Sequence, residues 1–157
     1  MDRIKAHVDL LLKLATANAT SGKGGPFAAL VTRGAEVISQ ATNEVLGNND
    51  PTAHAEVQAI RRACQHLDSF QLDGCELYTS CEPCPMCLGA IYWARPEKVY
   101  YVATRKEAAK GGFDDDFIYQ EINVPIEKRK ICFEKIKHSG SFEPFETWLG
   151  NATRTPY

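Results

Sequence analysis

The sequence predicts an α/β fold in which one mixed β-sheet carries helices on both of its faces. Helical and strand patterns alternate along the chain in the order α-β-β-α-β-α-β-α-β-α. The first two strands follow each other closely enough for an antiparallel hairpin, whereas later strands are separated by helices and should run parallel. A chain of 157 residues, 44% hydrophobic and without an internal linker, fits a single domain over residues 1–157.

The N-terminal half predicts a helix, a hairpin and a second helix. Apolar residues recur at helical spacing over residues 3–18, and a glycine-rich stretch then ends the helix. Residues 26–44 predict two short strands joined by a tight turn. Helix-start residues around Pro51 precede a helical pattern over residues 53–67.

The second half repeats the alternation of strand and helix. Residues 75–80 predict a short strand, and residues 85–94 predict a helix that ends before Pro96. The bulky residues over 98–103 predict a strand in the centre of the sheet. The remaining elements are a strand over 98–103, helical segments within 105–121, a strand over 130–137, a helix over 143–152 and a tail over 153–157.

Charge and hydropathy exclude some classes of protein. The formal net charge of -2 gives no indication of the basic surface that nucleic-acid binding favours. The longest apolar run near the N-terminus, Leu10 to Leu12, is too short for a signal peptide or a membrane span. We therefore expect a cytoplasmic protein that does not associate with a membrane. In that compartment the six cysteines are reduced, and we expect the clustered ones to bind metal.

The clustered cysteines predict a zinc site. Cys84 and Cys87 form a C-x-x-C pair with proline between them, which suits the first turn of a helix. The helix N-terminus favours thiolates, and His54 at the head of another helix is the natural third ligand. Two thiolates and one imidazole suit a catalytic Zn²⁺ with an open fourth position. Glu56 then lies beside the metal, where a carboxylate takes a proton from water and passes it on.

Other interpretations of these cysteines stay open at this point. A C-x-x-C pair in a reducing compartment also occurs as a redox dithiol. Cys81 extends the motif to C-x-x-C-x-x-C, which raises a three-thiolate site or a structural zinc site as alternatives. The pairing of "HAE" at 54–56 with "PCPMC" at 83–87 favours the catalytic zinc, because this combination is typical of zinc deaminases. Cys81 is then a buried neighbour of the site.

These two motifs resemble the cytidine deaminase-like superfamily, and longer strings are similar to the bacterial guanine deaminases. The longer strings are "NDPTAHAEVQAIR", "LYTSCEPCPMCLGAIYWARP", "GFDDDFIY" and a terminal tyrosine. The resemblance implies a three-layer α-β-α fold with a five-stranded mixed sheet. It also implies a homodimer in which the tail, about residues 150–157, is exchanged between subunits.

The resemblance also implies roles for single residues. Beyond the zinc ligands and the proton shuttle Glu56, it implies that Asn43 contacts the base and that the backbone of Ala55 lies against it. Phe27 and Trp93 would help to wall the pocket. Asp115 would handle the leaving amine, and Tyr157 would close the site, in the partner subunit if the tail is exchanged.

Blander interpretations of these residues remain. Asn43 could cap a turn, and Phe27 and Trp93 could be ordinary core residues. The acidic run 114–116 is also typical of a solvated surface, and the choice among its three members stays open.

The implied reaction is the zinc-dependent hydrolysis of guanine to xanthine and ammonia, in purine catabolism or salvage. The expected partner is a small purine base, not a nucleic acid. One alternative is a tRNA adenosine deaminase, although "GFDDDF" and the negative net charge disfavour a polynucleotide. A second alternative is a deaminase of cytosine, a triazine or guanosine. A third alternative is a non-catalytic zinc module. Glu56 disfavours this third alternative, because a structural zinc site has no use for that carboxylate.

Overall fold

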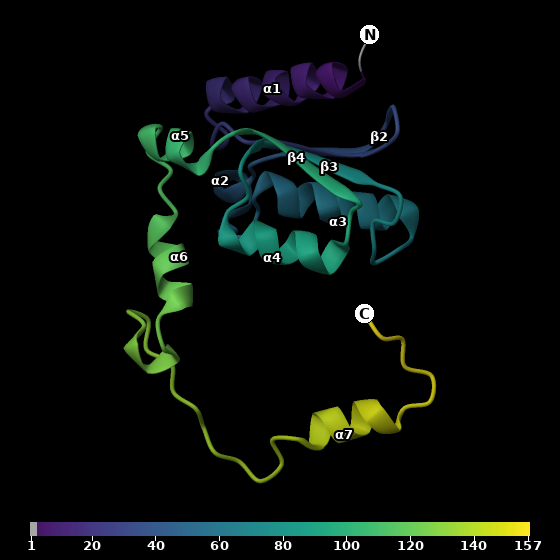
Figure 1. The fold of residues 1–157 in the computed structure, drawn as a ribbon, viewed down its shortest axis with the longest axis vertical. Coiled ribbons are helices and arrows are strands. Elements are labelled where there is room, and N and C mark those ends of the chain that lie inside the picture. Colours follow the sequence, from purple (N-terminus) through teal and green to yellow (C-terminus); the bar gives the residue numbers. More distant parts are fainter. Residues whose placement is uncertain (1–2) are drawn as a thin grey trace. The chain divides into compact units, whose positions relative to one another are not determined.

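The computed structural model describes residues 3–157, which form two compact units. The first unit ends at Asp115, and the second comprises Asp116–Tyr157. Each unit has its own arrangement of helices, and the whole sheet lies in the first unit (Figure 1).

The sheet of the first unit is mixed. Its strands are β1 (Ala28–Arg33), β2 (Glu36–Thr42), β3 (Glu76–Cys81) and β4 (Lys98–Ala103), in the order β2-β1-β3-β4. Strand β1 is antiparallel to β2 and to β3, whereas β3 and β4 are parallel. The predicted hairpin and the parallel pair joined by a helix are therefore confirmed. The prediction that the strand over 98–103 is central is wrong, because β4 lies at an edge of the sheet and its bulky residues do not reveal a missing neighbour.

Helices cover both faces of this sheet (Figure 1). α1 (Arg3–Ser21) packs on one face through a cluster that contains Leu11, Ala15 and Leu30. α3 (Ala55–Leu67) and α4 (Pro85–Ala94) lie on the other face around Val31 and Leu77. The three-layer α-β-α architecture therefore agrees with the prediction.

Alternating side chains in the central strands supply both cores. Tyr78 belongs to the α1 side, and its neighbour Leu77 belongs to the α3 side, because successive side chains of a strand point to opposite faces. α3 turns a face with Ala55, Ala59 and Ala63 toward the sheet. These small side chains allow a close approach, so that the Ser39 hydroxyl donates a hydrogen bond of 2.7 Å to the Ala59 carbonyl.

Two short helices complete the first unit. α5 (Arg105–Lys110) was expected and has a capping box between Thr104 and Glu107. α2 (Val45–Asn48) was not predicted, since four residues give no periodic pattern. Across residues 3–157, no helix combines the length and the apolar character that a bilayer crossing requires.

The second unit contains helices but no strand within its range 116–157. Its elements are α6 (Asp116–Asn123), a 3-10 turn (Ile126–Lys128) and α7 (Glu143–Gly150). The predicted strand over 130–137 is wrong, and with it the five-stranded sheet, because the described residues contain four strands. Alternation marks two faces, but a strand also needs a paired neighbour, and Ile131 and Ile136 are 74% and 84% exposed instead.

Candidate active site

Two helix N-termini of the first unit bring the three predicted zinc ligands together. His54 is the N-cap of α3, and Cys84 is the N-cap of α4, with Pro85 next to it in the first helical turn. The Nδ1 atom of His54 lies 3.6 Å from Cys84 Sγ and 3.5 Å from Cys87 Sγ. Among the described residues, these three form the group whose donor atoms lie within 4.8 Å of one another and could hold a metal.

The donor set fits zinc. Tetrahedral zinc with usual bond lengths separates a nitrogen and a sulfur ligand by about 3.6 Å, which matches both separations. The pKa of Cys84 is lowered to about 4, because Cys87 and His54 hydrogen-bond to its sulfur. A thiolate is thus favoured at the site without a cation, and binding of zinc would release the remaining thiol proton.

Glu56 lies beside these ligands with its two carboxylate oxygens in different surroundings. Oε2 is 3.4 Å from Cys87 Sγ, and Oε1 accepts a hydrogen bond of 3.0 Å from the Thr79 hydroxyl. The residue is 7% exposed, and burial raises the pKa of its carboxyl. A carboxyl with a raised pKa beside a metal site suits the acceptance and return of a proton.

Cys81 does not join the ligands. Its thiol lies 3.8 Å from the Thr104 carbonyl oxygen, and burial raises its pKa to about 11. The group of donor atoms that could hold a metal is His54, Cys84 and Cys87, without Cys81, so the structure favours the two-thiolate arrangement over a three-thiolate site.

Asn43 and Phe27 meet where the hairpin opens. The Asn43 amide donates a hydrogen bond of 3.0 Å to the Phe27 carbonyl, which continues the β1–β2 pairing by one step. Asn18 in the last turn of α1 donates to the carbonyls of Asn43 and Gly25 at 3.0 and 2.8 Å. A Cβ on Gly24 would lie 2.2 Å from the Asn43 carbonyl oxygen, so only glycine permits this close approach.

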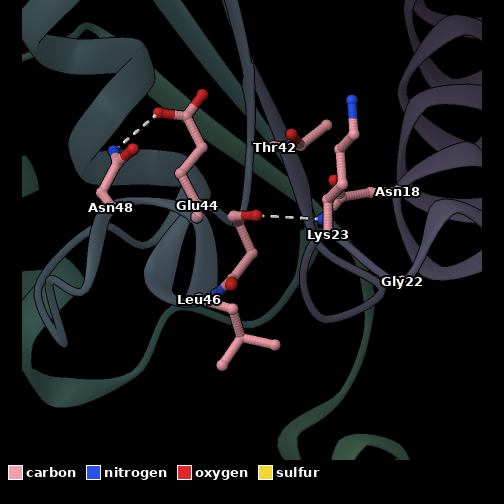
Figure 2. Close-up of a pocket in the computed structure, with 9 residues that line it drawn as sticks. Asn18, Gly22, Lys23, Thr42, Glu44, Leu46 and Asn48 are labelled. Atoms are coloured by element: carbon pink, nitrogen blue, oxygen red, sulfur yellow. Dashed lines mark hydrogen bonds between the residues drawn. The ribbon is translucent and has the colours of Figure 1, made fainter.

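Asn43 is also among the residues that line a hollow of about 490 Å³, which Figure 2 shows in close-up. Lys23 and Asn18 lie on one side of the hollow, and Glu44 and Asn48 lie on the other. Asn48 Nδ2 donates a hydrogen bond of 3.3 Å to Glu44 Oε2. The lining includes none of the three zinc ligands. Asn43 Oδ1 accepts a bond of 3.3 Å from the Val45 amide, so the turn-capping interpretation is correct for this oxygen.

Asp115 of the acidic run is coupled electrostatically to Cys84. Burial raises the pKa of its carboxyl first, and the charge of Cys84 raises it further. Phe113 packs edge-on against Phe27, with ring centroids 4.8 Å apart. The loop that carries Asp115 is thereby attached to the start of β1.

The other predicted site residues differ in their placement. Ala55 is buried as the first residue of α3, next to His54. The Trp93 ring, two turns beyond Cys87 in α4, is 63% exposed, so it is not the ordinary core residue of the alternative. Tyr157 belongs to the second unit, where its ring meets Trp148 with centroids 6.3 Å apart.

Three residues that were not predicted from the sequence also hold the site. Thr79 contacts Glu56, Asn18 contacts the Asn43 backbone, and Phe113 contacts Phe27. A polar residue in the apolar strand "ELYTSC" was a signal for Thr79, and an asparagine near the end of the α1 pattern was a signal for Asn18. The ring contact of Phe113 is long-range and had no local signal.

The fold and this site define a class of protein, and comparison with known families agrees. Residues 1–103 match the family model described as the cytidine and deoxycytidylate deaminase zinc-binding region. The chain belongs to this family of zinc-binding deaminases, and His54, Cys84 and Cys87 are the group that could hold the zinc.

Comparison with individual proteins narrows the class. The chain is 51% identical to guanine deaminase of Bacillus subtilis over 92% of both chains. The X-ray structure of guanine deaminase from the same organism superposes with a TM-score of 0.95 and 48% identity, covering 98% of each chain. A tRNA-specific adenosine deaminase of Aquifex aeolicus is 46% identical over 52% of this chain and 54% of its own length.

Proposed function

We propose that this protein catalyses the zinc-dependent hydrolysis of guanine to xanthine and ammonia. One observation carries the choice of substrate: the similarity to guanine deaminase extends over 92% of the chain, whereas the tRNA-specific adenosine deaminase matches 52%. If the protein shares its substrate with guanine deaminase of Bacillus subtilis, we expect the C-terminal residues to be needed as well as the zinc motif. The protein acts in purine catabolism or salvage.

The role of the three zinc ligands is to activate the attacking water. His54, Cys84 and Cys87 would hold the zinc, which would lower the pKa of a water molecule so that it could act as the nucleophile near neutral pH. Two helix N-termini face the ligands and favour their negative charge.

Glu56 moves the proton. It accepts a proton from the attacking water and delivers it to N3 of the ring while a C–O bond forms at C2. The C2–N bond then breaks, and ammonia leaves with the second proton. Asp115 assists the departing amine, which agrees with a carboxyl pKa that is already raised by burial and by the charge of Cys84.

The base itself is held by residues around the opening of the hairpin. Asn43 donates a hydrogen bond from its side-chain NH2 to the base, while its Oδ1 accepts one from the Val45 amide. The backbone of Ala55 and the rings of Phe27 and Trp93 form the walls. A free base is small, so stacking and a few hydrogen bonds determine its orientation.

The second unit supports a homodimer with an exchanged tail. Within residues 116–157 none is buried, and many large apolar side chains are exposed, among them Phe117, Phe133, Trp148 and Tyr157. Such surface favours burial against another chain. In this arrangement Tyr157 closes the site of the partner subunit, and each chain remains one functional domain.

Mixed dimers test the exchange. Glu56→Ala and Tyr157→Ala proteins are each impaired alone and are unfolded and refolded together. With exchange, random pairing restores about a quarter of the wild-type activity, because half of the dimers gain one complete site. Without exchange no activity returns, and light scattering of the wild type separately tests the dimer.

The six cysteines support a reducing compartment. All of them are free thiols in the structure, including the exposed Cys132. Such a set is retained in the cytoplasm, where glutathione keeps thiols reduced.

The substrate is tested directly by ammonia release from zinc-loaded protein. Guanine, adenine, cytosine, a triazine, guanosine and a tRNA anticodon stem-loop are assayed in parallel. Turnover of guanine with formation of xanthine is expected. Turnover of the stem-loop alone would favour the tRNA deaminase alternative, and turnover of another base or nucleoside would retain the zinc chemistry but contradict the substrate.

A further inference from the structure

Thr79 occupies a fixed position at the centre of the sheet. It lies on β3, 1% exposed, opposite Ala29 of antiparallel β1 and Tyr101 of parallel β4. Its side chain shares a face with Leu77, which is the face covered by α3. Both neighbouring strands hold the backbone, and burial of the β-branched side chain restricts its χ1, so the hydroxyl has little freedom to move.

The hydroxyl touches one end of the Glu56 carboxylate. Thr79 Oγ1 lies 3.0 Å from Glu56 Oε1 and 3.0 Å from the Cys81 carbonyl oxygen. A hydroxyl carries one proton, and a carboxylate accepts a stronger hydrogen bond than a neutral carbonyl. The proton is therefore donated to Oε1, which is the oxygen away from the Cys87 sulfur.

We propose that Thr79 is a positioning residue for the reaction: its hydroxyl binds Oε1 of Glu56 and keeps Oε2 turned toward the zinc ligands. Oε2 is the oxygen that lies 3.4 Å from Sγ of Cys87, which belongs to the group that could hold the metal. Without this bond the carboxylate rotates about its last side-chain torsion, which is a broad and soft one. Thr79 is not a member of the group that could hold the metal, and it acts through Glu56.

The proposal rests on the proposed function only for its activity assay. Thr79→Val removes the hydroxyl and keeps the size and branching of the side chain. We expect kcat for guanine to fall about 10- to 100-fold, since small misplacements of a catalytic group have effects of this size. KM should change less than about twofold because no contact with the substrate is removed. Thr79→Ser, which keeps the hydroxyl, should restore most of kcat.

Thr32 provides a matched control. It is a buried threonine on the adjacent strand β1, and its Oγ1 has no hydrogen-bond partner among the described residues. Thr32→Val makes the same chemical change without loss of a hydrogen bond, and wild-type kcat is expected. If Thr79→Val does not fold, Thr79→Ala takes its place in every comparison.

A double variant tests whether Thr79 acts through Glu56. In the Glu56→Ala background, Thr79→Val should not lower the residual activity any further, because the group it positions is absent. The proposal is overturned if the double variant is slower than Glu56→Ala alone. It is also overturned if Thr79→Val keeps kcat within about threefold of the wild type, or if Thr79→Ser is as slow as Thr79→Val.

A crystal structure of the zinc-loaded Thr79→Val variant supplies a measurement without substrate. We expect full zinc occupancy and a Glu56 carboxylate that no longer directs Oε2 toward the ligands. An unchanged carboxylate would overturn the proposal. This result stands whatever the substrate is, whereas a wild-type protein that forms no xanthine would contradict the proposed function alone.

Discussion

The ring of Phe113 meets the ring of Phe27 edge-on, at an interplanar angle of 86° and a centroid distance of 4.8 Å. The contact joins the segment before β1 to the loop that carries Asp115, two residues beyond Phe113. A Cβ on Gly25 would lie 3.0 Å from the Phe27 ring and 3.3 Å from the Phe113 ring, so the glycine leaves room for this pair.

Phe113→Ala should therefore loosen this loop and weaken catalysis. An edge-to-face pair contributes about 1 kcal/mol. If the loss appears in transition-state binding, kcat/KM for guanine falls about fivefold. Phe113→Leu, which keeps an apolar contact, should lie between the wild type and Phe113→Ala. Steady-state rates with equal zinc content are the measurement, and an unchanged kcat/KM in Phe113→Ala would contradict a role for the contact.

Glu56→Ala should keep zinc and the fold but lose nearly all turnover. General acid–base catalysis contributes about a hundred- to ten-thousand-fold, and kcat is expected to fall within this range. The fold should remain because burial raises the pKa of Glu56, so its charged form does not stabilise the native state. Xanthine formation, metal analysis and circular dichroism are compared with the exposed control Glu97→Ala. Retained turnover in Glu56→Ala would mean that another group moves the proton.

The three aspartates of the acidic run should differ in their effect on catalysis. Asp115→Asn should lower kcat about 10- to 100-fold, because Asp115 is proposed to assist the departing amine and its raised pKa suits a group that exchanges a proton. Asp114→Asn and Asp116→Asn are controls of the same chemistry and should stay within about threefold of the wild type. A larger loss of kcat in Asp114→Asn or Asp116→Asn than in Asp115→Asn would show that another aspartate of the run has this role.

Glu76 should make stability depend on pH. Its carboxylate accepts hydrogen bonds from Arg3, and these lower the pKa of Glu76 below its ordinary value of 4.5. A lowered pKa means that the stabilisation is present above pH 4.5 and is lost as the pH falls through the folded-state pKa. In urea unfolding, the free energy of unfolding should be larger for the wild type than for Glu76→Gln at pH 7, and this difference should decrease toward pH 3. A difference that does not change with pH would show that the Glu76 charge does not stabilise the fold.

Local patterns carried much of the fold prediction. The helix over 85–94 is observed with the predicted bounds, because Pro85 begins it and the residue before Pro96 ends it. The strand predicted over 75–80 is observed as Glu76–Cys81. The strand over 130–137 failed for the opposite reason, since its alternating pattern says nothing about whether a neighbouring strand exists to pair with it.

The zinc ligands and Glu56 were determined by the sequence itself. His54 and Cys84 are N-caps, and Cys87 lies in the first turn of α4, so short-range geometry already aims these side chains beyond the ends of their helices. Glu56 follows His54 in the first turn of α3. Only the tertiary structure decided which groups hold them: the Thr79 hydroxyl at Oε1 of Glu56, Asn18 at the Asn43 backbone, and Phe113 at Phe27. These partners are 23, 25 and 86 residues apart in the chain, and only the packing of β1, β3 and the helices brings them within contact.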